Sequence, residues 1–539
     1  MTFLRRMRKG DNVYVYRVES YREKGTGKVK QNSEYLGKEV EKNGEMVISP
    51  PKYRRNGVRK VLSFGGPVGL FSLAVDFNLD CIIDAAVEDC SGIDDVGKKI
   101  VILAINKVLS NDGFEGIGRW FCSTSLSSFS GLSSHNFTPK KVRGLYSLLS
   151  LENPDIIGMI EDGIIGQIKK SFPDDLSLLI YDLTDLLFYG SENGLAKYGH
   201  AYRRNGYEKQ INLMLAVTHE SRLPVHHRMI PGNIVSVSTI RRFTSELKGF
   251  DLKSSIAVID RGFHSKRNLE EFNDAECDII GALPSTVKLR SDALKKSKNI
   301  ENPKYYINYN SEILFIMEHE IDGKRFIVIH SPVKYGKELE RFYECINERE
   351  AYLKEQLNVN FSNKDEMIDE IESVLKPYQK CFKIQKIKTK EKWQFTYKLI
   401  NKNIKMKTNI LGKTVLFTTT KPSSFTPYDV LKTYREKDIV EKIFCIMKNK
   451  GLLPVHASTE ETTKAKGMLT VLGYLLLSLL QKRLEDKKRK EGNVSFSLDK
   501  KLMLLDEIKE VVYKNGSTTL TDLLKEQKEM LEKLNVVIK

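Results

Sequence analysis

Residues 427–450 read PYDVLKTYREKDIVEKIFCIMKNK and predict one helix of about six turns. Pro427 suits its first turn, and no Gly or Pro interrupts the stretch before Gly451. At roughly 100° per residue, apolar side chains gather on one side of this helix and polar ones on the other. The apolar side consists of Ile439, Ile443, Phe444, Ile446 and Met447, and the polar side of Tyr434, Lys437, Glu441 and Lys448. The polar side therefore presents a carboxylate beside a phenol and two amines, although an ordinary amphipathic helix with a solvated face has the same pattern.

The composition of the chain indicates a folded protein with a basic surface. Of its 539 residues 41% are apolar, which is enough for several units with buried cores and excludes a fully disordered chain. Lys and Arg number 87 against 70 Asp and Glu, so the net charge is +17, spread along the sequence. Such a surface favours a polyanionic partner and salt-sensitive binding, although a generally lysine-rich protein would have the same charge.

Cysteine and histidine usage gives no sign of a structural metal site. The seven cysteines include no C-x-x-C pair, which argues against a zinc finger or a disulfide framework and is typical of a reducing compartment. The adjacent His226 and His227 are expected to point apart on a strand. The N-terminus lacks a signal-peptide core, and the apolar run from Met468 to Leu480 is too short to span a bilayer. We therefore expect a soluble cytoplasmic protein with a buried helix at this run.

The first 172 residues divide into two parts. Residues 11–40 alternate in the manner of strands and predict a basic, tyrosine-rich hairpin that either follows a phosphate backbone or forms a solvated edge. Residues 66–171 contain several apolar runs with helical periodicity, separated by Gly, Ser and Pro clusters. They predict a small all-helical unit that could present a helix to DNA, without a pattern sharp enough to name that helix.

From Leu176 onward, short apolar runs typical of strands alternate with helical segments. The strand runs cover 176–190, 211–220, 223–233, 254–260 and 277–284, and the helical ones 239–250 and 265–272. This alternation predicts a mixed α/β sheet with helices on its faces. Residues 286–425 depart from it, because strand-like runs there surround a long charged helix, so we expect an inserted unit of separate architecture. The tail at 451–539 has helical patterns.

Three carboxylates stand at particular places in this pattern. Asp182 follows the first apolar run and is expected at the end of the first strand, Asp260 ends a later strand, and Glu441 lies on the helix at 427–450. Carboxylates gathered on adjacent strands repel one another, so a fold that gathers them needs a cation. Oxygen ligands select Mg²⁺ or Mn²⁺, and two such ions about 4 Å apart promote in-line phosphoryl transfer. Taken singly, each aspartate could equally cap a turn. Asp185 is the rival of Asp182, and on a strand their side chains point to opposite faces.

Several segments, in their order along the chain, resemble the DDE insertion-sequence transposases of the branch with the signature Tyr-x2-Arg-x3-Glu-x6-Lys. The signature is present as Tyr434-x2-Lys437-x3-Glu441-x6-Lys448, with Lys in place of Arg. YDLTDLLFYG (181–190) and AVIDRGFHS (257–265) resemble the strands that carry the two aspartates. YGHAYRRNGYEKQINLMLAV (198–217) and PGN (231–233) resemble the strands that link them. The resemblance runs from about Leu176 to His456, more than half of the chain.

The resemblance implies an α/β fold whose RNase H-like mixed-sheet core is interrupted by a β-rich insertion before the glutamate helix. The implied ranges are an N-terminal basic β-hairpin region (1–65), a helical DNA-binding region (66–172), the first part of the core (173–285), the insertion (286–425), the second part of the core (426–456) and a helical C-terminal region (457–539).

The resemblance also implies the chemistry of the three acids. Asp182, Asp260 and Glu441 would be catalytic and would hold two Mg²⁺ or Mn²⁺ ions. Arg261, beside one of these ligands, would either touch DNA or only balance charge. In the insertion, Trp393 would stack on an extruded base, or would simply pack on lysine side chains.

Three further residues of the signature would bind phosphates of DNA near the cleaved end: Tyr434, Lys437 and Lys448. The contact of Lys437 is expected to differ from the family pattern, because an ammonium lacks the bidentate geometry of a guanidinium.

The implied function is that of a cut-and-paste transposase. It would bind the terminal inverted repeats of its element as double-stranded DNA, cleave the ends with a divalent metal and transfer the 3′-hydroxyls to target DNA. Acting on two ends requires at least a dimer, located in the cytoplasm of a prokaryote and on its nucleoid when bound. Two alternatives stay open: an RNase H-like nuclease that cuts structured DNA without joining it, and an inactive element-derived protein that only binds DNA.

Overall fold

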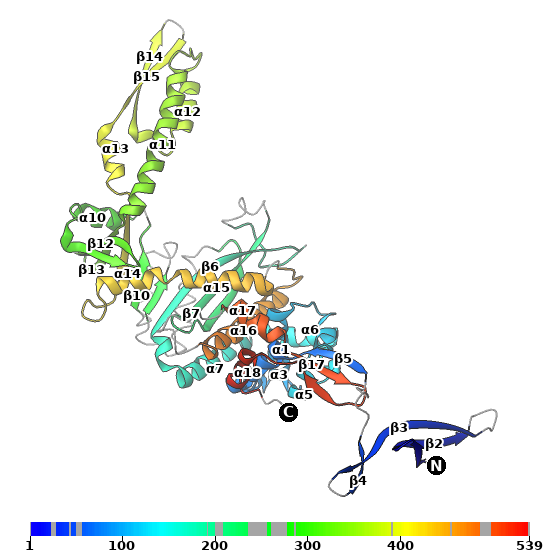
Figure 1. Ribbon diagram of the computed structural model, residues 1–539. Helices are drawn as coiled ribbons and strands as arrows, with labels where there is room; N and C mark the ends of the chain where they lie inside the picture. The colour runs from blue at the N-terminus through cyan, green and yellow to red at the C-terminus, as the bar shows by residue number, and fades with distance from the viewer. Residues whose placement is uncertain are drawn as a thin grey trace. The chain divides into compact units, whose positions relative to one another are not determined.

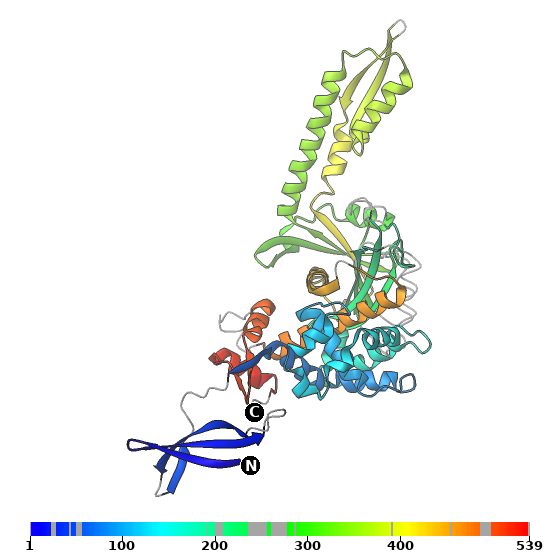
Figure 2. The same cartoon turned by 90° about the vertical axis from the view of Figure 1, so that its right-hand side faces the viewer.

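The computed structural model describes residues 2–22, 29–42, 45–49, 57–190, 192–199, 208–234, 256–259, 278–284, 287–389, 392–452, 455–485 and 497–536. The chain forms two compact units. The first combines residues 1–74, 112–142 and 483–539, and the second combines residues 75–111 and 143–482. Figures 1 and 2 show their helices and strands from two directions.

The first unit contains a four-stranded antiparallel sheet near the N-terminus. Its strands follow each other in the order β1 (Thr2–Lys9), β2 (Asn12–Arg22), β3 (Val29–Lys42) and β4 (Glu45–Ser49) (Figure 1). β2 and β3 form the hairpin that the sequence predicts, and β1 and β4 each add a strand to one side of it. The alternating basic and aromatic pattern of the first residues thus continues over a wider sheet.

The rest of the first unit joins the two ends of the chain. β5 (Val58–Ser63) pairs with β17 (Lys509–Tyr513), which also pairs with β18 (Thr518–Leu520). The helices of this unit are α1 (Gly65–Asp76), α4 (Ile117–Cys122), α5 (Leu126–Ser130), η1 (Ser134–Phe137), α17 (Leu498–Asp506) and α18 (Lys525–Lys533). The C-terminal region is therefore helical as predicted, with an additional hairpin that sequence patterns did not indicate, since its partner strand lies near the opposite end of the chain.

The second unit is built on a sheet with the strand order β11-β12-β13-β16-β10-β9-β6-β7-β8. The strands are β6 (Leu178–Leu187), β7 (Gln210–Thr218), β8 (Pro224–Pro231), β9 (Ile256–Ile259), β10 (Asp278–Ala282), β11 (Tyr306–Tyr309), β12 (Glu312–Ile321), β13 (Lys324–His330) and β16 (Lys413–Thr418). β9 is parallel to both β6 and β10, and the other neighbours are antiparallel. This mixed sheet confirms the predicted α/β class. The predicted helices at 239–250 and 265–272 lie outside the described residues.

Part of the predicted insertion extends this sheet. β16 pairs with β10 on one side and with β13 on the other, so the strand that returns from the insertion joins β11–β13 to the core strands. The middle of the insertion has a core of its own (Figure 1). That core is built from α11 (Pro332–Gln356), α12 (Lys364–Leu375), η5 (Gln379–Cys381), β14 (Phe382–Thr389), β15 (Lys392–Leu399) and α13 (Asn401–Thr408). Sequence patterns showed the strands but not their partners, which are set by long-range pairing.

Helices flank the sheet of the second unit. They are α2 (Leu79–Val87), α3 (Val96–Leu109), α6 (Pro139–Leu149), α7 (Ile156–Ser171), η2 (Pro173–Ser177), α10 (Lys288–Lys296), η4 (Pro303–Tyr305) and α16 (Glu460–Arg483). Among the described helices, α16 alone is long and apolar enough to cross a membrane, and 89% of its apolar stretch is buried inside the protein. It approaches α3 closely at Gly473, where a Cβ would lie 2.8 Å from the carbonyl oxygen of Ala104. These are the surroundings of a core helix.

Residues 427–452 form two α-helices and a short π-helical turn where the sequence predicts one helix. α14 (Pro427–Arg435) and α15 (Asp438–Met447) are separated at Glu436 and Lys437, and η6 (Lys448–Leu452) follows. At the break, the amide of Ile439 donates to the carbonyl of Glu436 and that of Val440 to the carbonyl of Lys437. These bonds reach back three residues instead of four, so the turn is tighter than an α-helix.

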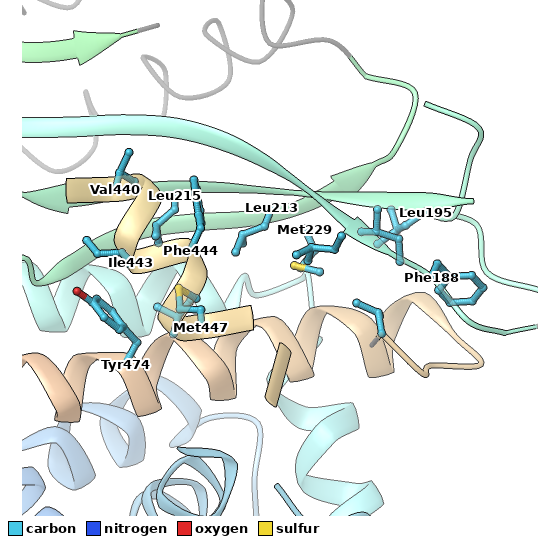
Figure 3. Close-up of a cluster of buried hydrophobic side chains, with 14 of the residues drawn as sticks. Phe188, Leu195, Leu213, Leu215, Met229, Val440, Ile443, Phe444, Met447 and Tyr474 are labelled. Carbon is cyan, nitrogen blue, oxygen red and sulfur yellow. The ribbon is translucent and has the colours of Figure 1, made fainter. Parts of the chain in front are cut away.

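The apolar side of α15 packs between the sheet and α16, as Figure 3 shows. Ile443, Phe444 and Met447 are buried against Leu213 and Leu215 of β7 on one side, and Tyr474 of α16 lies on the other. Ile439 and Ile446 pack against the same cluster. The predicted apolar side is confirmed. Because this packing fixes the rotation of α15, its polar side is held next to β6.

Candidate active site

Asp182 lies inside β6, which continues to Leu187, and not at the end of the strand as we expected. Asp182 pairs with Leu215 and Thr184 with Leu213, and both leucines belong to the cluster under α15. Side chains alternate along a strand, so Asp182 and Thr184 share the face toward α15, whereas Asp185 belongs to the opposite face. The sheet therefore separates the two rival aspartates.

Lys437 and Glu441 approach Asp182 from the beginning of α15. The Lys437 Nζ atom lies 3.7 Å from Oδ2 of Asp182 and 4.0 Å from Oε1 of Glu441. The side chains of Lys437 and Asp182 are largely buried, whereas that of Glu441 is 65% exposed. Both distances exceed an ordinary hydrogen bond, so the ammonium lies near two carboxylates without closing on either.

Lys448 reaches the same face of β6 from the end of α15. Its Nζ donates a hydrogen bond of 2.7 Å to the hydroxyl of Thr184. Sequence patterns named Lys448 for this site but not Thr184. The signal was present, because Thr184 is two residues from Asp182 and a strand repeats its faces every two residues.

The tight turn before α15 carries two further side chains. Tyr434 packs, partly buried, against a cluster that includes Ile280 and Leu431, a different set of residues from those around Glu441. Glu436 contacts the end of β7, where its Oε2 lies 2.5 Å from Nε2 of His219. Nothing in the sequence pattern connected His219 with this helix.

Asp260 and Arg261 lie outside the described residues. The strand that precedes Asp260 in sequence, β9, runs parallel to β6 with Val258 paired to Ile180. The two aspartate-bearing segments therefore enter from neighbouring parallel strands. The roles of Asp260 and Arg261 stay predictions.

Trp393 lies on β15, in the part of the insertion that has its own core. It packs partly buried against that core, and the ammonium groups of Lys364 and Lys388 lie 5.5 and 5.7 Å from its ring centroid. This is the packing on lysine side chains that we considered as the alternative to base stacking. Its contact with DNA stays a prediction.

The carboxylate oxygens of the site suit a hard divalent cation. Oxygens of Asp182 and Glu441 both approach the Lys437 ammonium, which shows that one positive charge can lie close to both. Carboxylate oxygens are the ligands that Mg²⁺ and Mn²⁺ prefer. Within the described ranges, no three His, Cys, Asp or Glu side chains form a complete metal site, and the third expected ligand, Asp260, is not among those residues.

A second carboxylate cluster lies on the same sheet, at its edge strand β8. Glu161 of α7 accepts hydrogen bonds from Nδ1 of His226 (2.9 Å), Nδ1 of His227 (2.7 Å) and Nη1 of Arg228 (2.7 Å). It also accepts one from the backbone amide of His227. Burial alone would raise the pKa of Glu161, but the histidines and Arg228 outweigh it and hold that pKa well below its ordinary value.

The two histidines thus reach one carboxylate, although we expected them to point apart. The reason is the position of Glu161 beside the edge of the sheet, where its bond to the backbone of His227 places it. Side chains from both faces of an edge strand can reach such a group. The cluster also satisfies an edge amide that would otherwise be open to another strand.

Among the comparisons with known proteins, the family model identifies the family of this chain. Residues 173–476 match the family model described as a transposase DDE domain, a range that includes Asp182, Asp260 and Glu441. A search of curated proteins gave no match. A similar solved structure is the cryo-EM structure of a piggyBac transposase synaptic complex with hairpin DNA. It is 11% identical, with a TM-score of 0.37, and the alignment covers 85% of this chain and 81% of that one.

Proposed function

Because this chain belongs to the family of transposases with a DDE domain, we propose that it cuts the ends of an insertion sequence and joins their 3′-hydroxyls to target DNA. The observation that carries this proposal is the position of Asp182 and Glu441 around one ammonium. They come from a central strand and from a helix that follows a long insertion, yet both lie within 4.0 Å of Lys437 Nζ. Two carboxylates repel each other, so an arrangement that brings them together is explained by a cation that both of them share.

Asp182, Asp260 and Glu441 would hold the metal, which we propose to be two Mg²⁺ or Mn²⁺ ions. When bound, such ions lower the pKa of the attacking oxygen and stabilise the leaving oxygen of a phosphodiester. The packing of α15 on the sheet keeps Glu441 at a fixed distance from Asp182. The exposed carboxylate of Glu441 leaves the site accessible to a large substrate.

The lysines of the site would orient the DNA. Lys448 is held by Thr184, and Lys437 lies near both acids, so both would place positive charge beside the scissile phosphate. Tyr434 and Arg261 are proposed to contact neighbouring phosphates, and Trp393 a base near the transposon end. A lysine binds phosphate as a point charge, so Lys437 would attract the backbone without the bidentate contact of an arginine.

Double-stranded DNA is the proposed partner, through the inverted repeats and the target. Cutting two ends in one event requires two active sites, so at least a dimer is expected on DNA. The net charge of +17 supports binding to a polyanion. We place the protein in the cytoplasm of a prokaryote, associated with the nucleoid.

A cleavage gel tests the proposal. End-labelled DNA with the inverted repeats of the element should be cut with Mg²⁺ and left intact with EDTA. Asp182→Ala, Asp260→Ala and Glu441→Ala should each abolish cutting while leaving end binding nearly unchanged. Asp185→Ala is the matched control, since it removes a carboxylate from the opposite face of the same strand, and it should cut normally. Undiminished cutting by any of the three alanine variants would refute the assignment.

A joining assay distinguishes the transposase from the two alternatives. Pre-cleaved ends with a free 3′-hydroxyl should become linked to a target plasmid. A nuclease would cut the uncleaved ends and leave the pre-cleaved ones unjoined. An inactive DNA-binding protein would shift the ends in a salt-sensitive manner and do neither.

A further inference from the structure

The N-terminal sheet has two chemically different faces. Residues paired directly opposite one another in antiparallel strands share a face. In β1–β3, Arg5 pairs with Tyr16 and Tyr16 with Tyr35, and Tyr14 pairs with Lys38. We call this side the tyrosine face. Lys9 also belongs to it, because it follows Arg5 by four residues along β1 and every second residue of a strand points to the same face. In β1–β3, no described residue of the tyrosine face is acidic. In β4, Glu45 belongs to the same face, paired with Lys42 at the end of β3.

The side chains of the tyrosine face lie together. The ring of Tyr35 lies 5.1 Å from that of Tyr16 and 5.9 Å from that of Tyr14, measured between centroids. The Arg5 guanidinium lies 5.8 Å from the ring centroid of Phe3 and donates a hydrogen bond to the neutral amide oxygen of Gln31. Phe3 is 40% exposed, so this end of the face is open to solvent. Aromatic rings and cations thus lie side by side, without a carboxylate among the described residues of this face in β1–β3.

The acids of β1–β3 lie on the other face. Glu19, Glu34, Glu39 and Glu41 all belong to it by register. Two of them pair with arginines of the same face: Oε1 of Glu39 lies 2.7 Å from Nε of Arg6, and Oε2 of Glu34 lies 3.6 Å from Nη1 of Arg17. β1–β3 therefore carry cations on both faces but acids on only one.

From this division we propose that the tyrosine face binds single-stranded DNA. Phosphates would contact Arg5, Lys9 and Lys38, and bases would stack on the tyrosine rings, which is how strand-binding proteins without sequence preference work. A duplex fits less well. Four strands spaced by about 4.8 Å place the outer ones about 14 Å apart, wider than the roughly 12 Å major groove of B-DNA. A single strand, with its bases unstacked, can lie across such a surface.

The proposal goes beyond strand cleavage and joining. It needs neither the divalent ion nor Asp182 and Glu441, which lie in the other unit of the chain. Binding can therefore be measured in EDTA, where no cutting takes place. A failure of this proposal and a failure of the transposase assignment are then separate results.

Two triple variants of the full chain provide the test. Arg5→Gln, Lys9→Gln and Lys38→Gln remove three cations from the tyrosine face, and Arg6→Gln, Arg8→Gln and Arg17→Gln remove three from the other. Both lose the same charge, so long-range attraction falls equally. By fluorescence anisotropy with labelled oligothymidylate in EDTA, the first triple should bind at least about tenfold more weakly than the second. Its plot of log affinity against log salt should be shallower than that of the wild type by about 2, since each phosphate contact on a single strand contributes about 0.7.

The aromatic contribution has its own pair of variants. Tyr16→Leu with Tyr35→Leu removes the stacking surface and should weaken binding by about fivefold or more, whereas Tyr16→Phe with Tyr35→Phe keeps the rings and should bind like the wild type. Circular dichroism of both doubles checks that the sheet is folded.

Three results would overturn the proposal. The first is an equal loss of affinity in the two triple variants. The second is duplex DNA of the same length that binds as tightly as oligothymidylate and loses affinity in the same variants. The third is oligouridylate that binds more tightly than oligothymidylate, which would assign the face to RNA.

Discussion

Asp182 and Glu161 illustrate the difference between a carboxylate available for a reaction and one that holds the fold together. Asp182 belongs to β6, and Glu161 of α7 contacts the edge strand β8 of the same sheet. Asp182 of β6 is paired with Leu215 of β7, and Leu215 is paired with His227 of β8, which contacts Glu161. Both sites therefore lie on one line of paired residues across the sheet. Around Glu161, donors lie at 2.7–2.9 Å and the carboxylate side chain is 4% exposed. The Lys437 ammonium lies 3.7 Å from the Asp182 carboxylate. The side chain of Glu441, which lies near the same ammonium, is 65% exposed.

The difference shows what each carboxylate is available for. Glu161 is surrounded by charged and neutral donors, so little of it is left for a ligand. Removing its charge would take from the buried Arg228 its nearer carboxylate, at 2.7 Å, and leave Asp155 at 3.4 Å. The Lys437 ammonium lies beyond hydrogen-bonding distance of both Asp182 and Glu441, so a divalent cation can take its place. The closed cluster should therefore act on stability and the open one on catalysis.

The largest expected effect separates the two sites by activity. Asp182→Asn should lower the rate of end cleavage by about a thousandfold or more, because it removes a ligand on which charge stabilisation depends. Its free energy of unfolding should fall less than that of Glu161→Gln, because asparagine keeps the shape of the side chain and Lys437 lies beyond hydrogen-bonding distance of Asp182. Single-turnover cleavage and urea unfolding measure the two quantities. Asp185→Asn, on the other face of the strand, should cut like the wild type, and the reverse result would exchange the two aspartates.

Glu161→Gln should show the opposite division. Breaking a buried, hydrogen-bonded ion pair typically costs about 3–5 kcal/mol, and we expect a loss of this size in urea unfolding. Well below its unfolding temperature, the variant should still cut DNA at the wild-type rate. Asp162→Asn is the control, because this neighbouring residue of α7 is exposed and its loss should matter little. An unaffected stability in Glu161→Gln would mean that the cluster is not what holds α7 to β8.

The pH dependence of this stability follows from the low pKa of Glu161. A carboxyl whose pKa is lower in the folded than in the unfolded state stabilises the fold above its unfolded pKa, near 4.5. That stabilisation is lost as the pH falls through the folded pKa. The difference in stability between the wild type and Glu161→Gln should thus shrink as the pH falls below about 4.5. A difference that grows below pH 4.5 would contradict the direction of the shift.

Metal binding should distinguish the open site from the closed one. Added Mn²⁺ should stabilise the wild type and so raise its unfolding temperature. At a Mn²⁺ concentration of a hundred times the dissociation constant, the gain in the free energy of unfolding is about 2.7 kcal/mol, and EDTA should reverse it. Asp182→Asn should reduce this gain strongly, and Glu161→Gln should keep it. Lys437→Gln should keep or increase it, because its ammonium no longer competes for the two carboxylates. Scanning calorimetry measures all four proteins.

The smallest expected effect concerns the support of Lys448. Thr184→Val removes the hydroxyl that accepts its hydrogen bond and should cost about 1 kcal/mol of stability. Because the bond also directs Lys448, the rate of cleavage should fall while the binding of Mn²⁺ is unchanged. Thr184→Ser keeps the hydroxyl and should restore both stability and rate.

Sequence patterns predicted the parts of this fold that depend on local periodicity. The apolar side of α15 and the strands β6–β10 could be inferred because each pattern is short and repeats with the period of its element. The break at Glu436 and Lys437 could not, because the tight turn depends on contacts such as that of Glu436 with His219, which is distant in sequence. A helical wheel that assumes one uninterrupted helix therefore placed Tyr434 beside Glu441, whereas Tyr434 packs against the cluster that includes Ile280 and Leu431.

The parts that failed to appear in the sequence depend on long-range pairing. β16 joins the insertion to the core through partners on both sides, and no local pattern names them. Glu161 was one acid in an amphipathic helix, and only its approach to β8 gives it two histidines and an arginine. For the candidate site, the three acids were inferred from a family resemblance, whereas Thr184 needed only the alternation of one strand.

The most direct measurement asks whether three distant acids share one ion. Fe²⁺ can replace Mg²⁺ at oxygen-ligand sites, and with ascorbate and peroxide it generates radicals that cut the polypeptide beside the ion. Cuts should appear near Asp182, near Asp260 and near Glu441 in the same preparation, and excess Mg²⁺ should suppress all of them together. Cuts at only one or two of these segments, or cuts that persist in Asp182→Asn, would contradict a common metal site.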